Sequence, residues 1–597
     1  MLDSRLKFLT SRAEEGPAEL ADLESTGRFA LTTEGVRRPR VRVLLHMAEG
    51  HGADDLADLS RQTGLTVLVQ AGDVVGGDIG IDRLTELDEL EAVGYVEASR
   101  PTHPELDAAV PETKADKVHT GPPGLRGAGV IVGVVDSGID WRHGCFRDPT
   151  GKTRILRIWD QNLAPEPGES SPAPFNHGVE YARSAIDTAL GSPDPMSVVR
   201  HMDDSVGHGT HVAGIAAGDG SSAGNGKPAF TFVGVAPEAD LVVVANQTTT
   251  EALGDSMSTL EAVGYVFKVA ETLGRPAVVN ISQGDNLGPH DGSSLLERGI
   301  DNLLNAPGHA LVKSAGNAAN AGVHATGQVT QGESDVVQFL VPVGDNTPDT
   351  VDIWYPGADR LSLRITTPNG TASAEVTPGT TVPDLALPGG NTAFVDSVVH
   401  HPQNGDNRIY VQLSPGSQTA IRPGTWSLTL IGQTVADDGR WHAWIERGQT
   451  VPQFIGSHRN DEMTISVPGT SRKVVTAASY ITKGAGQGNL STFSSRGPTR
   501  DGRHAPTLAA PGQAITSALV GAAGANQYQP MSGTSMAAPH LTGVCALMLQ
   551  STPTLTQDDL VLLLTKTARL DPFTVGAPNN DWGAGKVDAA AAVESIP

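Results

Sequence analysis

The chain has 597 residues and a formal net charge of −25, with 39% hydrophobic residues, 69 glycines and 40 prolines. At roughly 150 residues per domain, this length predicts about four globular units with many turns and loops. We expect neither nucleic acid nor a membrane as a partner: the negative charge repels a phosphate backbone, and no apolar run reaches the roughly 18 residues of a membrane helix.

The first residues, MLDSRLKFLTSRAEEG, mix charges into a segment without the apolar core of a secretory signal. We therefore expect a cytoplasmic protein, with non-classical export as the alternative. Residues 1–38 are interpreted as an N-terminal extension. Residues 39–103 follow as a small α+β module, in which the pattern predicts a strand (VRVLLHM), a helix (ADDLADLSRQTG), a strand (LTVLVQA), a further extended segment and a second helix (DRLTELDELEAVGYVEA).

An aspartate follows the next strongly apolar run. The residues from Gly129 to Val135 are largely β-branched, which predicts a buried parallel strand. Asp136 would then lie at the C-terminal end of that strand, the edge at which ligands bind in open α/β sheets. The alternative is a turn aspartate that hydrogen-bonds its own backbone before Gly138.

A histidine opens a stretch of small residues, HGTHVAGIAAG, which begins at His208. Such a stretch can form a helix packed closely against its neighbours, and the glycines on either side leave room for the imidazole. His208 and His211 are three residues apart, but the Glu of a zinc-protease HExxH motif is missing. We therefore predict no metal here and interpret His211 as a packed helix histidine.

From residue 327 to 452 the pattern changes to short alternating segments such as LSLRITTP, RIYVQLS and TWSLTLIGQ. Clusters of Gly, Pro, Asn and Asp separate them, which predicts an inserted antiparallel β-sandwich of jelly-roll type. Trp354, Trp441 and Trp444 suggest carbohydrate binding as an alternative role for the insert. In a sandwich, however, such residues are more often part of the core.

A serine stands at the start of a last apolar helix. Ser535 follows Gly533 and Thr534, and HLTGVCALMLQ continues as a buried helix. The free N–H groups of a helix N-terminus favour an oxyanion, although serine is also an ordinary N-cap. A serine nucleophile needs a base, and the base needs a partner that sets its tautomer. Asp136, His208 and Ser535 together meet this requirement. The non-catalytic interpretations of the single residues do not explain why all three occur in one chain.

The segments VVDSGID, HGTHVAG and SGTSMAAPH closely resemble the three motifs of the subtilisin-like serine protease family, and the order Asp, His, Ser is that of subtilisin. The resemblance covers residues 104–326 and 453–597. It implies an α/β domain with a subtilisin-like parallel sheet flanked by helices. In the family's mechanism His208 would take the proton of Ser535, Asp136 would orient the imidazole, and Ser535 would attack a peptide carbonyl. Asn317, in the segment SAGN, matches the family's oxyanion asparagine; the alternative is a loop asparagine in a left-handed turn.

The same resemblance implies a substrate-binding surface. One part is a strand whose main chain pairs with an extended peptide, one part precedes Asn317, and one part lies beside the family's cis-proline loop at the floor of the primary specificity pocket. These residues are Ser282, Gln283 and Gly284, then Ser314, Ala315 and Gly316, and finally Ser466. No cofactor is expected to be required. Calcium sites are common in the family, but the resemblance assigns no ligands here.

The resemblance extends to the other modules. The module at 39–103 resembles the inhibitory prodomain of subtilases, and we expect self-cleavage between Arg100 and Pro111. The insert resembles that of the germination-associated clostridial subtilases, which is thought to rigidify the enzyme or to retain the prodomain. The sequence thus predicts a serine endopeptidase, made as a self-processing zymogen, that acts on proteins or peptides and has its own prodomain as inhibitor and chaperone. The alternatives are a transpeptidase or peptide cyclase, and a prodomain-locked scaffold or signalling protein without activity.

Overall fold

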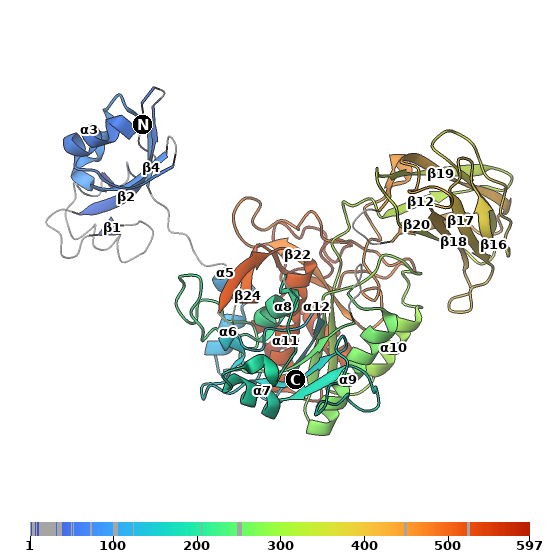
Figure 1. Ribbon diagram of the computed structural model, residues 1–597, viewed down its shortest axis with the longest axis horizontal. Helices are drawn as coiled ribbons and strands as arrows, with labels where there is room; N and C mark the ends of the chain where they lie inside the picture. Colours follow the sequence, from blue (N-terminus) through green and yellow to red (C-terminus); the bar gives the residue numbers. More distant parts are fainter. Residues whose placement is uncertain are drawn as a thin grey trace. The chain divides into compact units, whose positions relative to one another are not determined.

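The computed structural model describes residues 39–597, apart from 49, 52, 72–73, 99–105, 123, 205, 248–252, 447–450 and 522–525. Before residue 39 it describes Leu2, Leu6, Leu9, Thr10, Ala13, Leu31 and Thr32. The chain divides into two compact units, Met1–His103 and Pro104–Pro597, which Figure 1 colours along the sequence. Within the described residues, no helix has the length and apolar character needed to cross a membrane.

Among the described elements of the first unit are an antiparallel sheet and two helices that lie between its strands in the sequence. Its strands follow the order β1 (Leu31–Thr32), β2 (Arg40–Met47), β4 (Val74–Gly80) and β3 (Thr66–Ala71), and β5 (Val93–Ala98) also pairs with β2. The helices are α3 (Ala53–Thr63) and α4 (Leu84–Asp88), the latter preceded by the 3-10 turn η1 (Ile81–Arg83). Leu2, Leu6 and Leu9 belong to the same hydrophobic core as Val43 and Leu84. Residues before position 39 therefore contribute to the core of this unit.

The helix predicted over DRLTELDELEAVGYVEA is wrong in its second half. The helix α4 ends at Asp88, and VGYVEA forms β5, which pairs antiparallel with the second half of β2, from Val43 to Met47. Val96 is fully buried while its neighbour Tyr95 is 39% exposed, which is the alternation of a half-buried strand. Val93, Tyr95 and Val96 are residues that favour strands, so the prediction extended the helix too far along the chain.

The second unit contains an eight-stranded sheet with the order β23, β22, β11, β10, β6, β9, β7, β8. Neighbouring strands are parallel, except that β8 is antiparallel to β7. The strands in sequence order are β6 (Ile131–Asp136), β7 (Ile155–Asp160), β8 (Val179–Ala182), β9 (Asp240–Ala245), β10 (Ala277–Ile281), β11 (His309–Ser314), β22 (Val475–Ile481) and β23 (Leu508–Gln513).

Helices cover both faces of this sheet. Val132 and Val134 of β6 share a core with α8 (His208–Ala217) and α11 (Thr534–Ser551), whereas Ile131 and Val135 share another with α9 (Ser256–Leu273) and α10 (Leu295–Leu303). Both faces being buried explains the continuous apolar run that precedes Asp136. The predicted α/β fold class is confirmed. The unit's other helices are α5 (Leu106–Glu112), α6 (Ala115–Thr120), α7 (Arg183–Leu190), α12 (Gln557–Lys566) and α13 (Ala589–Glu594).

An antiparallel sandwich interrupts the parallel domain. A six-stranded sheet with the order β12, β20, β14, β18, β17, β16 and a four-stranded sheet with the order β15, β19, β13, β21 share one hydrophobic core. Trp354, Trp441 and Trp444 are all buried, so none of them offers a surface for a sugar. The strands are β12 (His324–Gln328), β13 (Ser334–Val341), β14 (Asp349–Tyr355), β15 (Arg360–Thr366), β16 (Thr381–Ala386), β17 (Thr392–Val398), β18 (Asn407–Ser414), β19 (Gly424–Thr434), β20 (Arg440–Ile445) and β21 (Gln453–Ile455). A separate hairpin, β24 (Ile515–Leu519) and β25 (Gln527–Met531), precedes α11.

Two helical glycines provide a test of how tightly α11 is packed. A Cβ added to Gly543 in α11 would lie 2.4 Å from the Cβ of Val235, whereas one added to Gly264 in α9 would meet no atom within 4 Å. We expect Gly543→Ala to lower the free energy of unfolding by about 1–3 kcal/mol, because overpacking outweighs the gain in helix propensity. Gly264→Ala should raise it by about 0.5–1 kcal/mol. Urea unfolding in a Ser535→Ala background measures both, and a Gly543→Ala protein as stable as its parent would contradict the packing argument.

Candidate active site

Asp136 occupies the predicted position at the C-terminal end of β6, and its side chain is fully buried. Its Oδ1 accepts hydrogen bonds from His208 Nδ1 (2.7 Å) and from the Ser137 N–H (2.8 Å). An ionised carboxylate can only accept a hydrogen bond, so the Nδ1 atom of His208 carries the proton in this contact, and in neutral His208 that is the ring's one N–H. The other ring nitrogen, Nε2, is then the basic one.

His208 is the first residue of α8, and it follows Gly207 in the left-handed conformation (φ 69°). The helix starts very close to the loop after Asp136: a Cβ on Gly209 would lie 2.1 Å from the Gly138 carbonyl oxygen. Only glycine therefore allows α8 to begin at this place. The imidazole keeps 24% of its surface exposed, which leaves one side open to a ligand.

Several carboxylates act on the charge of His208. Burial by itself would lower the pKa of the imidazole, but the charge of Asp136 and its hydrogen bond, together with the charges of Asp203 and Asp204, outweigh burial and raise the pKa. Asp203 is itself buried and accepts hydrogen bonds from Ser137 Oγ (2.6 Å) and the Thr210 N–H (2.8 Å). Sequence analysis missed Asp203, because an acid five residues before a histidine carries no recognisable signal.

Ser535 is the second residue of α11, a helix that packs against α8. Its side chain is mostly buried, and the hydroxyl donates to the Ser282 carbonyl oxygen at 3.2 Å. Among the hydrogen bonds of the described residues, none joins Ser535 to His208. The structure thus brings Asp136 and His208 into direct contact and ties Ser535 to the end of β10. Contacts between a base and its nucleophile are often long before substrate binds.

Asn317 follows β11 and turns toward the start of α11. Its Oδ1 accepts from both the N–H and the hydroxyl of Thr534, each at 2.9 Å, and the Gly316 N–H donates to the same hydroxyl at 3.0 Å. Because the amide oxygen is held by Thr534, the NH₂ group is the part of Asn317 that can donate to a ligand. The Ser535 N–H lies at the same helix N-terminus, where main-chain N–H groups lack intrahelical partners.

The residues predicted to bind substrate lie in adjacent segments. Ser282, Gln283 and Gly284 follow β10, and the Ser466 N–H donates to the Ala315 carbonyl at 2.9 Å. A Cβ on Gly284 would lie 2.9 Å from Ser466 Oγ. The peptide bond between residues 467 and 468 is cis, as the resemblance implied. Together with Ser314, Ala315 and Gly316, these segments border the start of α11.

A buried lysine lies beneath this surface. Lys313 in β11 has no exposed area, and its Nζ donates to Ser314 Oγ (3.0 Å) and Ser466 Oγ (3.2 Å). Lysine is almost never fully buried, so its position is unusual. In the sequence, Lys313 stands out only as a charged residue within an apolar strand. Its contact with Ser466 could not be predicted from the sequence, because the two residues are far apart in the chain. The segment expected to form the floor of the specificity pocket therefore lies over an ammonium group.

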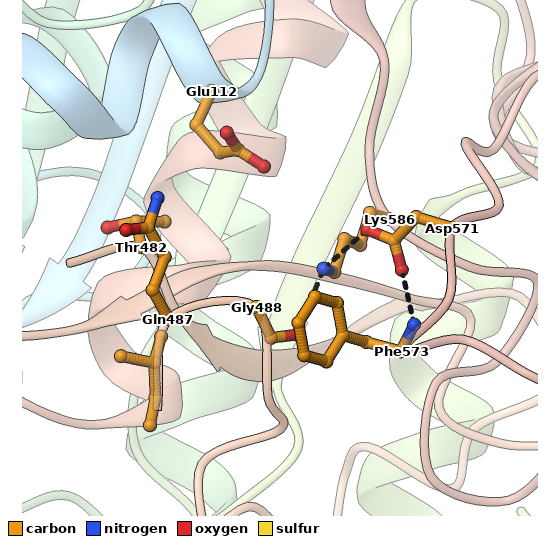
Figure 2. A pocket seen from close by; sticks show the side chains of 8 residues that line it. Glu112, Thr482, Gln487, Gly488, Asp571, Phe573 and Lys586 are labelled. Atoms are coloured by element: carbon orange, nitrogen blue, oxygen red, sulfur yellow. Dashed lines mark hydrogen bonds and ion pairs between the residues drawn. The ribbon is translucent and has the colours of Figure 1, made fainter. Parts of the chain in front are cut away.

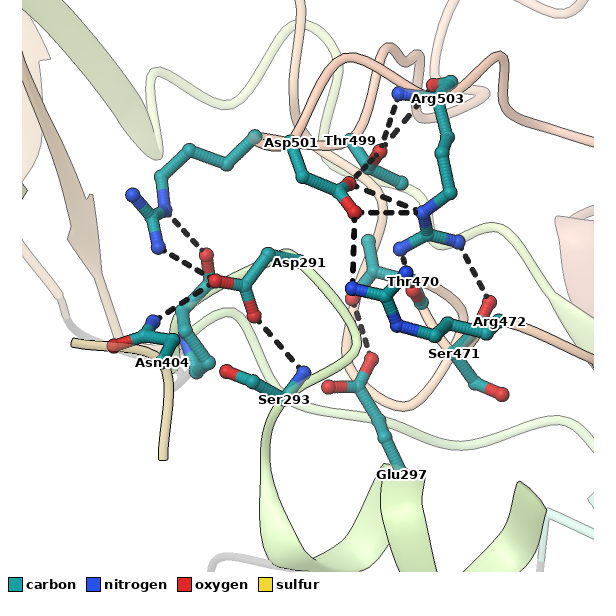
Figure 3. A network of polar contacts seen from close by, with 12 residues as sticks. Asp291, Ser293, Glu297, Asn404, Thr470, Ser471, Arg472, Thr499, Asp501 and Arg503 are labelled. Carbon is teal, nitrogen blue, oxygen red and sulfur yellow. Dashed lines mark hydrogen bonds and ion pairs between the residues drawn. The ribbon is translucent and has the colours of Figure 1, made fainter. Parts of the chain in front are cut away.

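The inserted sandwich contacts the loop that follows Ser282–Gly284. Asp352 in β14 accepts the Gly288 N–H at 3.1 Å. Asn404 of the insert donates to Asp291 at 2.9 Å, a contact visible in Figure 3. Arg500 forms ion pairs with both Asp291 and Asp406 of the insert at 2.7 Å. Side chains of the insert therefore hold the loop 285–291 in place.

The second histidine of the HGTH motif has a structural role. His211 is buried, its Nε2 contacts the Gln529 carbonyl at 2.8 Å, and burial lowers its pKa to about 3. The interpretation as a packed helix histidine is confirmed. Throughout the part of the chain that the structure describes, no group of three or more His, Cys, Asp or Glu side chains is placed to hold a metal ion.

A pocket of about 300 Å³ lies away from these residues, and Figure 2 shows its lining. Lys586, which is almost fully buried, pairs there with Asp571 at 2.7 Å. Its ammonium group also lies within about 5 Å of the ring centres of Tyr480, Phe573 and Trp582. Because this charge is already paired and surrounded, we interpret the pocket as a packing feature of the C-terminal segment.

The chain belongs to the subtilase family, whose sequence pattern matches residues 127–425 and 447–585. It is 26% identical over 473 residues to the PII-type proteinase of Lactococcus lactis subsp. cremoris, covering 71% of this chain and 23% of that protein. It is 37% identical over 164 residues to the serine protease AprX of Bacillus subtilis, covering 25% of this chain and 35% of that protein. The aligned regions thus span only about a quarter to a third of these curated relatives.

Among solved structures, the chain is similar to the CspB protease of Clostridium perfringens. The TM-score is 0.70 at 27% identity, and the match covers 82% of this chain and 96% of that one. Such coverage includes more than the parallel domain. The predicted resemblance to the clostridial subtilases is therefore confirmed, while the jelly-roll type of the insert stays a prediction.

The electrostatics of His208 can be tested without any assumption about activity. In a Ser535→Ala background, NMR titration should show that Asp136→Asn lowers the pKa of His208, because the change removes the strongest interaction that raises it. Asp203→Asn should lower this pKa by a smaller amount. Asp148→Asn, which alters a half-buried carboxylate that hydrogen-bonds Thr150 and Lys152, is the control and should leave it unchanged. An unaltered His208 titration in Asp136→Asn would contradict the geometry described here.

Proposed function

We propose that this protein is a serine endopeptidase that hydrolyses peptide bonds through an acyl-enzyme. The observation that carries the proposal is the 2.7 Å hydrogen bond from His208 Nδ1 to the buried Asp136, in a fold where α8, which begins at His208, packs against α11, the helix that bears Ser535. Membership of the subtilase family supports it. Proteins or peptides are the substrates that this chemistry implies.

In the proposed mechanism, the Ser535 hydroxyl leaves the Ser282 carbonyl and donates to His208 Nε2. His208 removes the proton while Ser535 Oγ attacks the carbonyl carbon of the substrate, and Asp136 stabilises the imidazolium that forms. Asn317 and the Ser535 N–H donate hydrogen bonds to the oxyanion. His208 then protonates the leaving amine, and a water molecule deprotonated by His208 releases the acyl group. Because only neutral His208 can act as a base, activity should rise as the pH passes above its raised pKa.

An extended substrate would pair its main chain with Ser282, Gln283 and Gly284, in the manner of an added β-strand. The contacts of Asp352 and Asn404 with the following loop support a role for the insert in keeping this strand in position. Ser314, Ala315, Gly316 and Ser466 would surround the side chain on the acyl side of the cut.

Two alternatives predict different products. In a transpeptidase or peptide cyclase of the same fold, an amine rather than water would release the acyl group. Mass spectrometry distinguishes them, since hydrolysis in H₂¹⁸O labels the new carboxylate while transfer incorporates an added amine. In a scaffold or signalling protein locked by its prodomain, Ser535 would not react at all.

The proposal is tested by labelling with a fluorophosphonate probe and by casein cleavage. We expect the parent to be labelled and active, Ser535→Ala to be unlabelled and inactive, and Asn317→Ala to retain the label but to lose about 10²- to 10³-fold in kcat. Ser532→Ala, which changes an exposed serine just before the helix, is the matched control and should behave like the parent. An unlabelled parent protein would contradict the proposal and favour the silent scaffold.

We further propose that the unit Met1–His103 is an inhibitory prodomain that the protein removes from itself. The predicted cut lies between Arg100 and Pro111. Residues 100–105 of this stretch lie outside the described residues. Ala109 and Val110 of α5 are packed in the core of the second unit, so a cut inside α5 would require local unfolding. This favours cleavage before Leu106.

Self-cleavage is tested by mass spectrometry of the purified protein. The parent and Ser532→Ala should lose the first unit and begin at a residue between 101 and 106, while Ser535→Ala should stay at full length. Identical processing of Ser535→Ala would show that another protease makes the cut.

A further inference from the structure

A groove of about 630 Å³ lies beside α12. Its other walls come from the segments that precede β22 and β23 and from the segment 568–584. Binding sites for small ligands have volumes of about 300–1,000 Å³, so the groove is large enough to hold several side chains of a partner. None of the residues assigned above to catalysis or to the substrate-binding surface lines it, so its occupant would be a separate ligand.

One wall of the groove is apolar and open to solvent. Leu562 of α12 and Leu570 keep 62% and 61% of their surface exposed, although both are large apolar side chains. Val561 lies beside Leu562 on the same helix, and Thr565 follows one turn later, so that α12 presents a continuous face to the groove. Large apolar side chains that are exposed together mark interaction sites.

The charged residues of the groove are all basic. The chain as a whole carries 67 acidic residues against 42 lysines and arginines. Among the described residues that line the groove there is nevertheless no Asp or Glu, whereas the basic ones are Arg472, Lys473, Arg503, His504 and Lys566. The groove therefore concentrates positive potential on a protein whose net charge repels anions elsewhere.

The two arginines differ in what they can offer to a ligand. Arg503 is occupied within the protein, because it pairs with Asp501 at 2.9 Å and donates to the Thr470 carbonyl at 2.7 Å (Figure 3). Arg472 reaches the same Asp501 only at 3.4 Å, and its side chain is 61% exposed. The guanidinium of Arg472 can therefore turn to a carboxylate of a ligand.

Further cations come from other segments. Lys473 shares its charge with the exposed Asp558 at 3.1 Å. In the part of the chain that the structure describes, neither Lys566, at the end of α12, nor His504 forms an ion pair, and both side chains are exposed. The available cations thus stand on three separate segments around the groove. This arrangement suits a ligand with more than one carboxylate.

We propose that the groove binds an acidic peptide segment of a partner protein, in which Asp or Glu residues flank leucine-like side chains. Clustered cations are a common device for recognising acidic motifs, and apolar side chains supply the anchors that such a groove needs. A long-chain carboxylate would fit the apolar wall, but its single charge would leave most of the cations without a partner. The inference goes beyond the proposed proteolysis and applies equally to the inactive protein.

The groove adjoins the loop beside the predicted specificity pocket. Gly469 lines the groove, and its N–H donates to the Ser466 carbonyl at 2.7 Å. A bound peptide would therefore contact this loop from the groove, without entering the surface formed by Ser282, Gln283 and Gly284.

The test measures fluorescence anisotropy of a labelled peptide of alternating leucine and glutamate pairs, with the full chain carrying Ser535→Ala, at low ionic strength. Lys566→Gln should weaken binding by about 2- to 5-fold, because it removes one exposed ion pair. Leu562→Ser should weaken it by about 5- to 10-fold, because it removes apolar contact area. Lys117→Gln and Leu295→Ser, which change exposed residues of α6 and α10, are the matched controls and should bind like the parent.

Salt and altered peptides test the two parts of the recognition. Raising the ionic strength should weaken binding to the parent and bring Lys566→Gln closer to it. Peptides with lysine in place of glutamate, or serine in place of leucine, should bind more weakly. Since Lys566 and Leu562 are exposed, both groove variants should fold, which circular dichroism checks.

Equal affinity of the parent, Lys566→Gln and Leu562→Ser for the acidic peptide would overturn the proposal, since the peptide would then bind elsewhere. Tighter binding of the lysine peptide would overturn it too. Binding of decanoate that Lys566→Gln weakens, without any binding of the acidic peptide, would overturn the assignment to a peptide.

Discussion

The site depends on the register of three parallel strands. Ile281 at the end of β10 lies opposite both Val135 of β6 and Lys313 of β11. The next residues, Asp136, Ser282 and Ser314, therefore lie in one row at the carboxyl edge of the sheet. Parallel strands bring residues that are far apart in the chain to the same edge, which is where ligands bind in such sheets. The starts of α8 and α11 complete the arrangement with His208 and Ser535.

The buried negative charge of Asp136 determines the electrostatics of the site. Asp136 is fully buried, and its Oδ2 accepts no hydrogen bond within the described residues. The charge of Asp136 is thus stabilised by hydrogen bonds from His208 Nδ1 and the Ser137 N–H, and Asp203 adds to the negative potential at His208. This explains how His208 can have a raised pKa although burial opposes it. An exposed carboxylate would be screened by water and would have a weaker effect.

The inserted sandwich is coupled to the site through polar contacts. Asp352 and Asn404 reach the loop 285–291, and Arg500 joins that loop to Asp406 of the insert. Charged hydrogen bonds of this kind fix orientation more strictly than apolar packing does. Movement within the sandwich would therefore displace the loop 285–291 and, with it, the adjoining segment Ser282–Gly284.

The sequence by itself determined the features that depend on local patterns: the apolar strand before Asp136, the helices that begin near His208 and Ser535, and the alternation of the inserted strands. These follow from short-range periodicity, which neighbouring residues set. Only the tertiary structure decided that Ser535 contacts Ser282, that Lys313 reaches Ser466 and that Asp203 acts on His208. It also made a strand of VGYVEA, which the sequence analysis assigns to the preceding helix. Each of these depends on contacts between segments far apart in the chain, and no local pattern encodes which of the many available partners a side chain meets.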